Sequence, residues 1–293
     1  MKIESHRKGN MIGVNSCGRF GNQLFQFAFA YATSKKLDTS FFIDESISPF
    51  KLPNYFKLYR YNKFYNATKR KWFKLQKRKQ INQLTYDNWK SPSKNLLLLK
   101  DNTIYKGFFQ SEEYFKNSKK DIKKLFEIKN KYKRTFVLKY KTIFDKHKII
   151  AIHIRRKDYL FYGNNTLGGK NLTLPISYYK NCLGRIKNID KYIIIFVSDD
   201  INYVKEKFGR KDNYRFESNS EIMDFQILLS ANVLILSNST FAWWAAYLNS
   251  KTNMVLAPKN WLGFKVDKEY PIGICKKQWT WIDVPLKIPQ KKK

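Results

Sequence analysis

The apolar and polar positions at the start of the chain predict a strand, a loop and a helix. Residues 11–15 form a short apolar run, and Gly18 and Gly21 bracket the loop that follows it. Residues 22–36 place apolar side chains at helical spacing, which predicts one buried helix face. That face comprises Leu24, Phe25, Ala28, Phe29 and Ala32. This order of elements is typical of the opening of a Rossmann-like unit.

From residue 149 the pattern becomes a regular alternation of short apolar runs and amphipathic stretches. The continuous apolar run 192–197 is typical of a strand that is buried on both faces, as in parallel sheets. The predicted strands are 149–155, 192–197, 214–216, 233–237 and 253–257. The predicted helices are 176–187, 201–208, 221–230 and 240–249. Repeated strand–helix units predict a parallel, Rossmann-like sheet.

The middle of the chain lacks this regularity. Residues 50–135 are aromatic and Lys-rich, with amphipathic patches such as 114–128, and we expect helices there. We therefore predict an α/β protein with two Rossmann-like domains facing a cleft. Residues 1–148 would form the first domain and residues 149–293 the second, with the Trp-rich segment 261–289 packing back across both.

Composition excludes several classes of protein. The 293 residues include 57 Lys and Arg against 23 Asp and Glu, a net charge of +34, yet 43% are hydrophobic and 17% aromatic. This apolar content excludes a disordered basic tail. No apolar run reaches the roughly 18 residues of a spanning helix, and residues 1–11 lack a signal-peptide pattern. Three widely spaced cysteines predict buried, reduced thiols, so we expect a cytoplasmic protein.

The positive charge is concentrated in residues 51–150, which hold 28 Lys and Arg against seven Asp and Glu. The densest run is 69–79. Such a run indicates a solvated face, an anionic membrane surface or a nucleic-acid site, and we favour these in that order. Most of the cations are Lys, whereas Arg is the usual choice for reading phosphates and bases.

Polar residues at the carboxyl ends of predicted strands are the first candidates for chemistry, because ligands of open parallel sheets bind there. His153, Arg155, Arg156 and Asp158 close the strand 149–155, and alternation places His153 and Arg155 on one face. An Arg fork suits a phosphate. Asp158 would accept a proton or pair with one of the arginines. The alternative for the whole set is a structural ion-pair cluster.

Two further strand ends carry polar residues. Ser198, Asp199 and Asp200 follow the strand 192–197. Either Ser198 or an Asp would cap the next helix, or an Asp would bind a base or ribose. After the strand 233–237, small polar side chains lead into a helix, whose N-terminus would cap itself or bind an anion. These residues are Ser237, Asn238, Ser239 and Thr240, followed by Phe241. We expect Trp243 and Trp244 in this helix to be core residues rather than a platform that stacks on a ligand.

The N-terminal loop is the fourth candidate. Gly21 and the preceding glycine allow a tight turn, Asn22 would cap the helix, and Arg19 would point toward the cleft. The glycine spacing fits neither a dinucleotide fingerprint nor a P-loop. Taken together, the four places predict a pyrophosphate held by arginines and a helix dipole. No residue set with metal-ligand spacing accompanies them, which fits a nucleotide-sugar donor.

Four ordered blocks resemble those of the bacterial galactoside α-1,2-fucosyltransferases, glycosyltransferase family 11. They are GRFGNQLFQFAFAYA (18–32), HIRRKDY (153–159), FVSDD (196–200) and SNSTFAWWAAYL (237–248). The resemblance implies a GT-B-like fold and inverting transfer of L-fucose from GDP-L-fucose to the 2-hydroxyl of a terminal galactose. It implies no metal or other cofactor. The implied acceptor is a galactose-terminated oligosaccharide or lipid-linked glycan of a surface polysaccharide.

The resemblance also implies roles for the candidate residues in binding the donor. Arg155 would hold the pyrophosphate, and Asp158 would be the base or would only orient Arg155. The implied donor contacts are His153 in the nucleotide pocket, Asp199 or Asp200 at guanine, Ser239 and Thr240 at phosphate, and Arg19 and Asn22 at the phosphate or the sugar. Further donor-binding residues are Arg156, Ser237, Asn238, Phe241 and Gly21.

Two alternatives stay open at this point. One is a related enzyme of α-1,6 type, and the other is a basic nucleic-acid-binding protein, in which the four blocks have no role. We expect no nucleic-acid partner. Since lipid-linked acceptors are built at membranes, we expect a peripheral location at the inner face of the cytoplasmic membrane.

Overall fold

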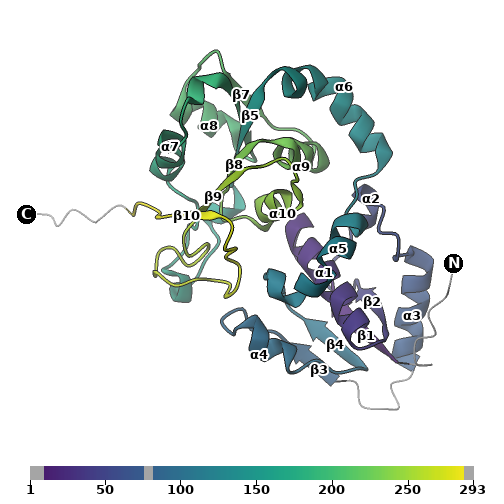
Figure 1. Ribbon diagram of the computed structural model, residues 1–293. Coiled ribbons are helices and arrows are strands. Elements are labelled where there is room, and N and C mark those ends of the chain that lie inside the picture. Colours follow the sequence, from purple (N-terminus) through teal and green to yellow (C-terminus); the bar gives the residue numbers. More distant parts are fainter. Residues whose placement is uncertain (1–9, 76–81, 287–293) are drawn as a thin grey trace, which may run out of the picture. The chain divides into compact units, whose positions relative to one another are not determined.

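The computed structural model describes residues 10–75 and 82–286, and the chain divides into two compact units (Figure 1). The first unit comprises Met1–Asn130 and Pro271–Ile274, and the second comprises Lys131–Tyr270 and Cys275–Lys293. The division falls ahead of the boundary that we expected after residue 148. The part of the basic run beyond residue 75 and residues 287–289 of the Trp-rich segment lie outside the described residues.

The first unit contains a four-stranded parallel sheet in the order β2-β1-β4-β3. Its strands are β1 (Met11–Asn15), β2 (Ser40–Asp44), β3 (Asn82–Thr85) and β4 (Thr103–Lys106). Strand β1 has the predicted bounds. Helix α1 (Phe20–Lys36) begins two residues earlier than predicted, and it is buried on nearly all sides because it is apolar around most of its circumference.

Short elements fill the irregular middle of the chain, where we expected helices. The helices are α2 (Leu52–Tyr55), α3 (Lys63–Leu75), α4 (Pro92–Leu96) and α5 (Lys119–Leu125), with 3₁₀ turns at Glu112–Tyr114 and Lys116–Ser118. Strands β2, β3 and β4 were not predicted from the sequence. Strand β3 is largely exposed, so it carries none of the apolar pattern by which buried strands are recognised.

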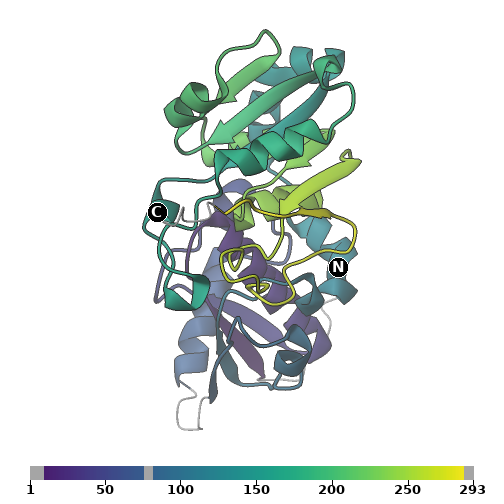
Figure 2. The same cartoon turned by 90° about the vertical axis from the view of Figure 1, so that its left-hand side faces the viewer.

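The second unit contains a six-stranded parallel sheet in the order β10-β9-β8-β5-β6-β7, drawn mostly in greens in Figure 2. The strands are β5 (Lys148–Ile154), β6 (Tyr192–Ser198), β7 (Tyr214–Glu217), β8 (Val233–Ile235), β9 (Met254–Pro258) and β10 (Thr280–Ile282). The helices are α6 (Asn130–Lys146), α7 (Ile176–Gly184), α8 (Ile201–Phe208), α9 (Glu221–Ser230) and α10 (Thr240–Leu248). The predicted alternation from residue 149 is confirmed, with ends shifted by at most three residues.

The contacts of helix α6 explain why the boundary between the two units lies before residue 148. The hydroxyl of Tyr140 on α6 donates to Glu217 Oε2 at 2.7 Å, and the amide of Gln226 on α9 donates to the carbonyl oxygen of Tyr132 at 3.2 Å. These contacts bind α6 to the second unit. The chain returns to the first unit at residues 271–274, where the N–H of Ile272 donates to the carbonyl of Asn88 at 3.0 Å.

Three further sequence predictions concern burial. Trp243 and Trp244 on α10 are fully buried, so they form core rather than a ligand platform. Cys182 is buried, but Cys17 is only half-buried and Cys275 is exposed, so the prediction of buried thiols was wrong for these two. Among the described helices, none has the length and apolar character to cross a membrane.

Candidate active site

The candidate site of the second unit forms where three neighbouring strands end. Strand β5 lies between β6 and β8, and all three run parallel, so the segments after their carboxyl ends lie at one edge of the sheet. His153 on β5 lies 2.7 Å from Ser237, measured from Nδ1 to the hydroxyl oxygen. This hydrogen bond joins the end of β5 to the segment that leads into α10.

His153 is a neutral, buried group. Its side chain is only 5% exposed, and its ring lies against that of Phe241 with centroids 5.4 Å apart. Burial, reinforced by the neighbouring Arg155 cation, lowers the pKa of His153 to about 3. The imidazole therefore carries no charge at neutral pH, and it can position a ligand or the Ser237 hydroxyl but not act as a cation.

Arg155 is held between two carboxylates. Its Nη2 atom lies 2.8 Å from Oδ1 of Asp158, and its Nε lies 3.4 Å from Oδ2 of Asp199 at the end of β6. The side chain is 18% exposed. Among the described residues Nη1 makes no polar contact, so one edge of the fork remains available to an anion.

Arg156 is held more firmly than Arg155. Its Nε lies 3.0 Å from Oδ2 of Asp200, and its guanidinium carbon lies 3.3 Å from the ring centroid of Tyr203 on α8. Its backbone N–H donates to Asp199 Oδ1 at 2.9 Å. These contacts are those expected of a structural ion pair, which was the alternative to a ligand-binding role for Arg156.

Asp200 occupies the N-cap position of α8, but its side chain makes no capping hydrogen bond. The Ser198 hydroxyl instead accepts from the backbone N–H of Asp200 at 3.0 Å. Of the two expected caps, Ser198 or an Asp, the Asp side chain does not cap α8, because the Asp200 carboxylate turns to Arg156. Its Oδ1 has no polar partner in the part of the chain that the structure describes.

The start of α10 combines a fixed loop with an uncompensated helix dipole. The Asn238 amide donates to the carbonyl of Leu172 at 2.9 Å, and the Tyr159 hydroxyl donates to the carbonyl of Asn238 at 3.2 Å. Ser239 is the N-cap residue, but its side chain makes no capping hydrogen bond, and the first turn carries no acidic residue. The predicted capping by this hydroxyl is therefore absent, and the positive end of the dipole favours an anion there.

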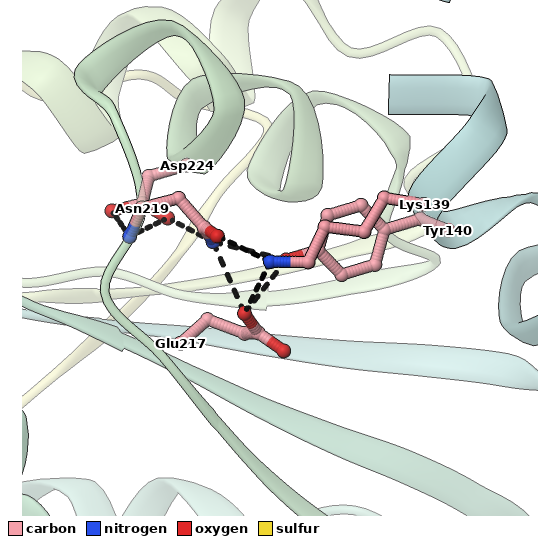
Figure 3. Close-up of polar contacts among 5 residues, drawn as sticks. All are labelled: Lys139, Tyr140, Glu217, Asn219 and Asp224. Atoms are coloured by element: carbon pink, nitrogen blue, oxygen red, sulfur yellow. Dashed lines mark hydrogen bonds and ion pairs between the residues drawn. The ribbon is translucent and has the colours of Figure 1, made fainter. Parts of the chain in front are cut away.

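The sequence analysis missed a polar cluster after β7, the strand beside β6 (Figure 3). The amide of Asn219 donates to Glu217 Oε2 at 3.1 Å, to Asp224 Oδ1 at 2.9 Å and to the Tyr140 hydroxyl at 3.0 Å. Both Asp224 oxygens also accept from the backbone N–H of Asn219. Burial raises the pKa of Asp224.

A signal for this cluster was present in the sequence. Glu217 and Asn219 follow a predicted strand, so the expectation that ligands bind at the carboxyl ends of parallel strands also applies to them.

Aromatic contacts connect helix α9 to the site. Phe225 contacts Phe241 at a ring-centroid distance of 5.3 Å, and Phe241 contacts His153.

The predicted N-terminal candidates belong to the first unit. Gly18 has φ +74°, a left-handed conformation that favours glycine, and Arg19 occupies the N-cap position of α1. Gly21 and Asn22 lie within the helix, so the predicted cap at Asn22 was wrong. The Asn22 side chain instead accepts from the Gln110 amide at 2.8 Å. A role of these residues toward the donor stays a prediction.

Within residues 10–75 and 82–286, no group of three or more His, Cys, Asp or Glu side chains is arranged to hold a metal ion.

The sequence profile of "Glycosyl transferase family 11" matches residues 2–283. The chain belongs to this family. The O-antigen biosynthesis glycosyltransferase WbnK of Escherichia coli is 26% identical over 292 residues, covering 83% of this chain and 92% of WbnK. An α-1,2-colitosyltransferase of Escherichia coli is 27% identical over 299 residues, covering 94% of this chain and 99% of that protein. The resemblance read from the four blocks is confirmed.

Solved structures share the fold of this family 11 protein. The NodZ α-1,6-fucosyltransferase co-crystallised with GDP has a TM-score of 0.54 at 13% identity, covering 87% of this chain and 96% of NodZ. POFUT1 in complex with GDP has a TM-score of 0.51 at 12% identity, covering 86% and 99%. The GT-B-like α/β fold is confirmed, and the protein is a glycosyltransferase of family 11.

Proposed function

We propose that this enzyme transfers L-fucose from GDP-L-fucose, with inversion, to the 2-hydroxyl of a terminal galactose in a surface glycan. The observation that carries the proposal is the position of Arg155. It lies at the end of β5 with one edge of its fork available and two carboxylates fixing its orientation. A fixed arginine beside the start of a helix that carries no acidic residue in its first turn suits the pyrophosphate of a nucleotide-sugar.

The proposed reaction is a single in-line displacement. The galactose 2-oxygen forms a bond to C1 of fucose while the bond from C1 to the β-phosphate oxygen breaks, and the electron pair leaves with GDP. Arg155 and the N-terminus of α10 stabilise the charge that develops on the departing diphosphate. The proton of the 2-hydroxyl passes to Asp158 or to water. The 2.8 Å contact of Asp158 with Arg155 supports an orienting role for this carboxylate.

Recognition of guanine requires a carboxylate that accepts from its N1–H and N2–H groups. Of the two aspartates predicted for this contact, we favour Asp200, which is the more exposed carboxylate, since Asp199 Oδ1 accepts from the backbone N–H of Arg156 and its buried Oδ2 lies 3.4 Å from Arg155 Nε without a hydrogen bond. Asp224 provides the comparison, because both of its carboxylate oxygens already accept hydrogen bonds from Asn219. Loss of GDP affinity in Asp200→Asn but not in Asp224→Asn would select Asp200.

A second donor is favoured by one of the relatives. The similarity to an α-1,2-colitosyltransferase supports GDP-L-colitose, whose sugar is a fucose without its 3-hydroxyl. The structural neighbours include an α-1,6-fucosyltransferase. The linkage of the product therefore has to be determined separately from the identity of the donor sugar.

One experiment separates these activities. Purified protein is incubated with GDP-fucose or GDP-colitose, a panel of galactose-terminated oligosaccharides and EDTA, and the product linkage is determined by NMR. We expect an α-1,2-fucosylated product and no loss of rate with EDTA. A product formed only from GDP-colitose, an α-1,6 linkage or a requirement for metal would each contradict the corresponding part of the proposal.

A further inference from the structure

Helix α3 of the first unit has one face fixed against the sheet. Phe73 packs with Met11 and Phe42, and the rings of Phe42 and Phe73 lie 5.1 Å apart. Asn66 binds strand β2 by two hydrogen bonds, donating to the carbonyl of Ile43 at 3.0 Å and accepting from the N–H of Ile43 at 2.7 Å. These contacts determine which face of the helix is turned away from the sheet.

The opposite face of α3 carries an exposed apolar stripe, formed by Phe64, Tyr65, Trp72 and Leu75. These side chains are 76%, 65%, 39% and 79% exposed. At 100° per residue they lie within about a quarter of the helix circumference. Single exposed apolar side chains are common, but several large ones along one helix face mark an interaction surface.

Exposed lysines border this stripe. Lys71 and Lys74 are exposed and follow the stripe along its length, whereas two other cations of α3 are directed back to the protein. Lys69 donates to the carbonyl of Phe41 at 3.4 Å, and Arg70 lies 3.9 Å from Asp44. The helix contains no acidic residue. The exposed face therefore combines apolar and cationic groups without an opposing charge of its own.

We propose that α3 is an interfacial membrane-binding helix, with its apolar stripe among the lipid chains and its lysines at anionic phospholipid headgroups. Charge complementarity selects this occupant, because a bilayer of anionic lipid offers both an apolar layer and a negative surface. A nucleic acid would leave Leu75 in water, since it binds cations and stacks on aromatic rings but does not bury aliphatic chains. The inference goes beyond the proposed function and does not depend on it.

The test is co-sedimentation of the full chain with vesicles. We expect binding to vesicles of phosphatidylglycerol and phosphatidylcholine, and none to pure phosphatidylcholine. Phe64→Ser and Leu75→Ser should each lower the partition coefficient about tenfold, which is the size expected when one large apolar side chain no longer enters the bilayer. Lys71→Gln combined with Lys74→Gln should weaken binding and reduce its salt dependence.

Leu138→Ser is the matched control. Leu138 lies on α6 of the second unit and is 88% exposed, so the substitution removes an equally exposed leucine outside α3. Circular dichroism and GDP-fucose turnover on a soluble acceptor should be unchanged in all these variants. Undiminished vesicle binding by the α3 variants, an equal loss in Leu138→Ser, or binding to RNA with no binding to anionic vesicles would overturn the proposal.

Discussion

The guanidinium of Arg155 and the carboxylate of Asp158 lie 2.8 Å apart, three residues apart in the chain just after strand β5. Asp199, from the end of the neighbouring strand β6, contacts the same guanidinium from its Nε edge. The two carboxylates thus set the direction of the remaining edge of the fork. We regard this orientation as the main contribution of the protein to holding a diphosphate.

Replacing Arg155 tests this relationship directly. Arg155→Ala should lower kcat/KM by about 10²–10³, the usual effect of removing one charge-stabilising donor from an active site. Circular dichroism should show an intact fold. Arg210→Ala, at an exposed position of the same unit, is the control and should retain full activity. Near-normal turnover in Arg155→Ala would disprove the assignment.

Asp158→Asn distinguishes an orienting carboxylate from a catalytic base. If Asp158 orients Arg155, the KM for GDP-fucose rises about tenfold and kcat changes little, since a contact of this kind contributes on the order of 1–2 kcal/mol. Steady-state kinetics with varied donor gives both constants. A fall in kcat by about 10² or more with unchanged KM would instead identify Asp158 as the base.

His153 makes stability depend on pH. Its folded pKa, about 3, lies below the ordinary value of 6.5, so the unfolded chain binds a proton between these pH values that the folded protein does not. This contribution to stability is complete above pH 6.5 and is lost as the pH falls toward 3. At pH 5 the loss amounts to about 2 kcal/mol in the free energy of unfolding.

Urea denaturation at pH 7, 6 and 5 measures this dependence. His153→Gln removes the titrating group, so its free energy of unfolding should vary less over the same range, although the variant is less stable at pH 7. His147→Gln, at an exposed residue near the end of α6, should retain the full dependence. An unaltered slope in His153→Gln would mean that other groups cause it.

The cluster after β7 should tolerate no further negative charge. Asn219→Asp places a third carboxylate beside Glu217 and Asp224, and it replaces a donating amide by a group that only accepts. We expect a loss of about 2 kcal/mol in the free energy of unfolding at pH 7, measured by chemical denaturation.

Lys139→Met provides the comparison for this cluster. Lys139 lies 3.6 Å from Glu217 and donates to Asn219 Oδ1 at 2.6 Å, but its side chain is 51% exposed and it leaves the donating amide of Asn219 in place. An exposed ion pair contributes at most about 1 kcal/mol, so this variant should be nearly as stable as the native protein. An equal loss in both variants would show that charge balance, rather than the amide of Asn219, holds the cluster together.

The sequence predicted most of the second unit, because its central strands β5, β6 and β8 are largely buried and its helices show apolar periodicity, whereas the three-residue strand β10 was not predicted. The run 192–197 became β6 almost unchanged, and 201–208 and 221–230 became α8 and α9 with the predicted bounds. The first unit was harder to predict. Strand β3 is exposed and only four residues long, so its pattern does not distinguish it from a loop.

The chain by itself determined which residues end the strands, and with them the candidates His153, Arg155, Asp199 and Ser237. Only the tertiary structure decided their partners: Asp158 and Asp199 hold Arg155, whereas Asp200 turns from the helix cap to Arg156. The spacing of apolar residues along the chain predicts which positions of a helix or strand are buried, because the local backbone geometry decides which side chains share a face. The choice of a charged partner depends on distances across neighbouring strands, which a linear sequence does not contain.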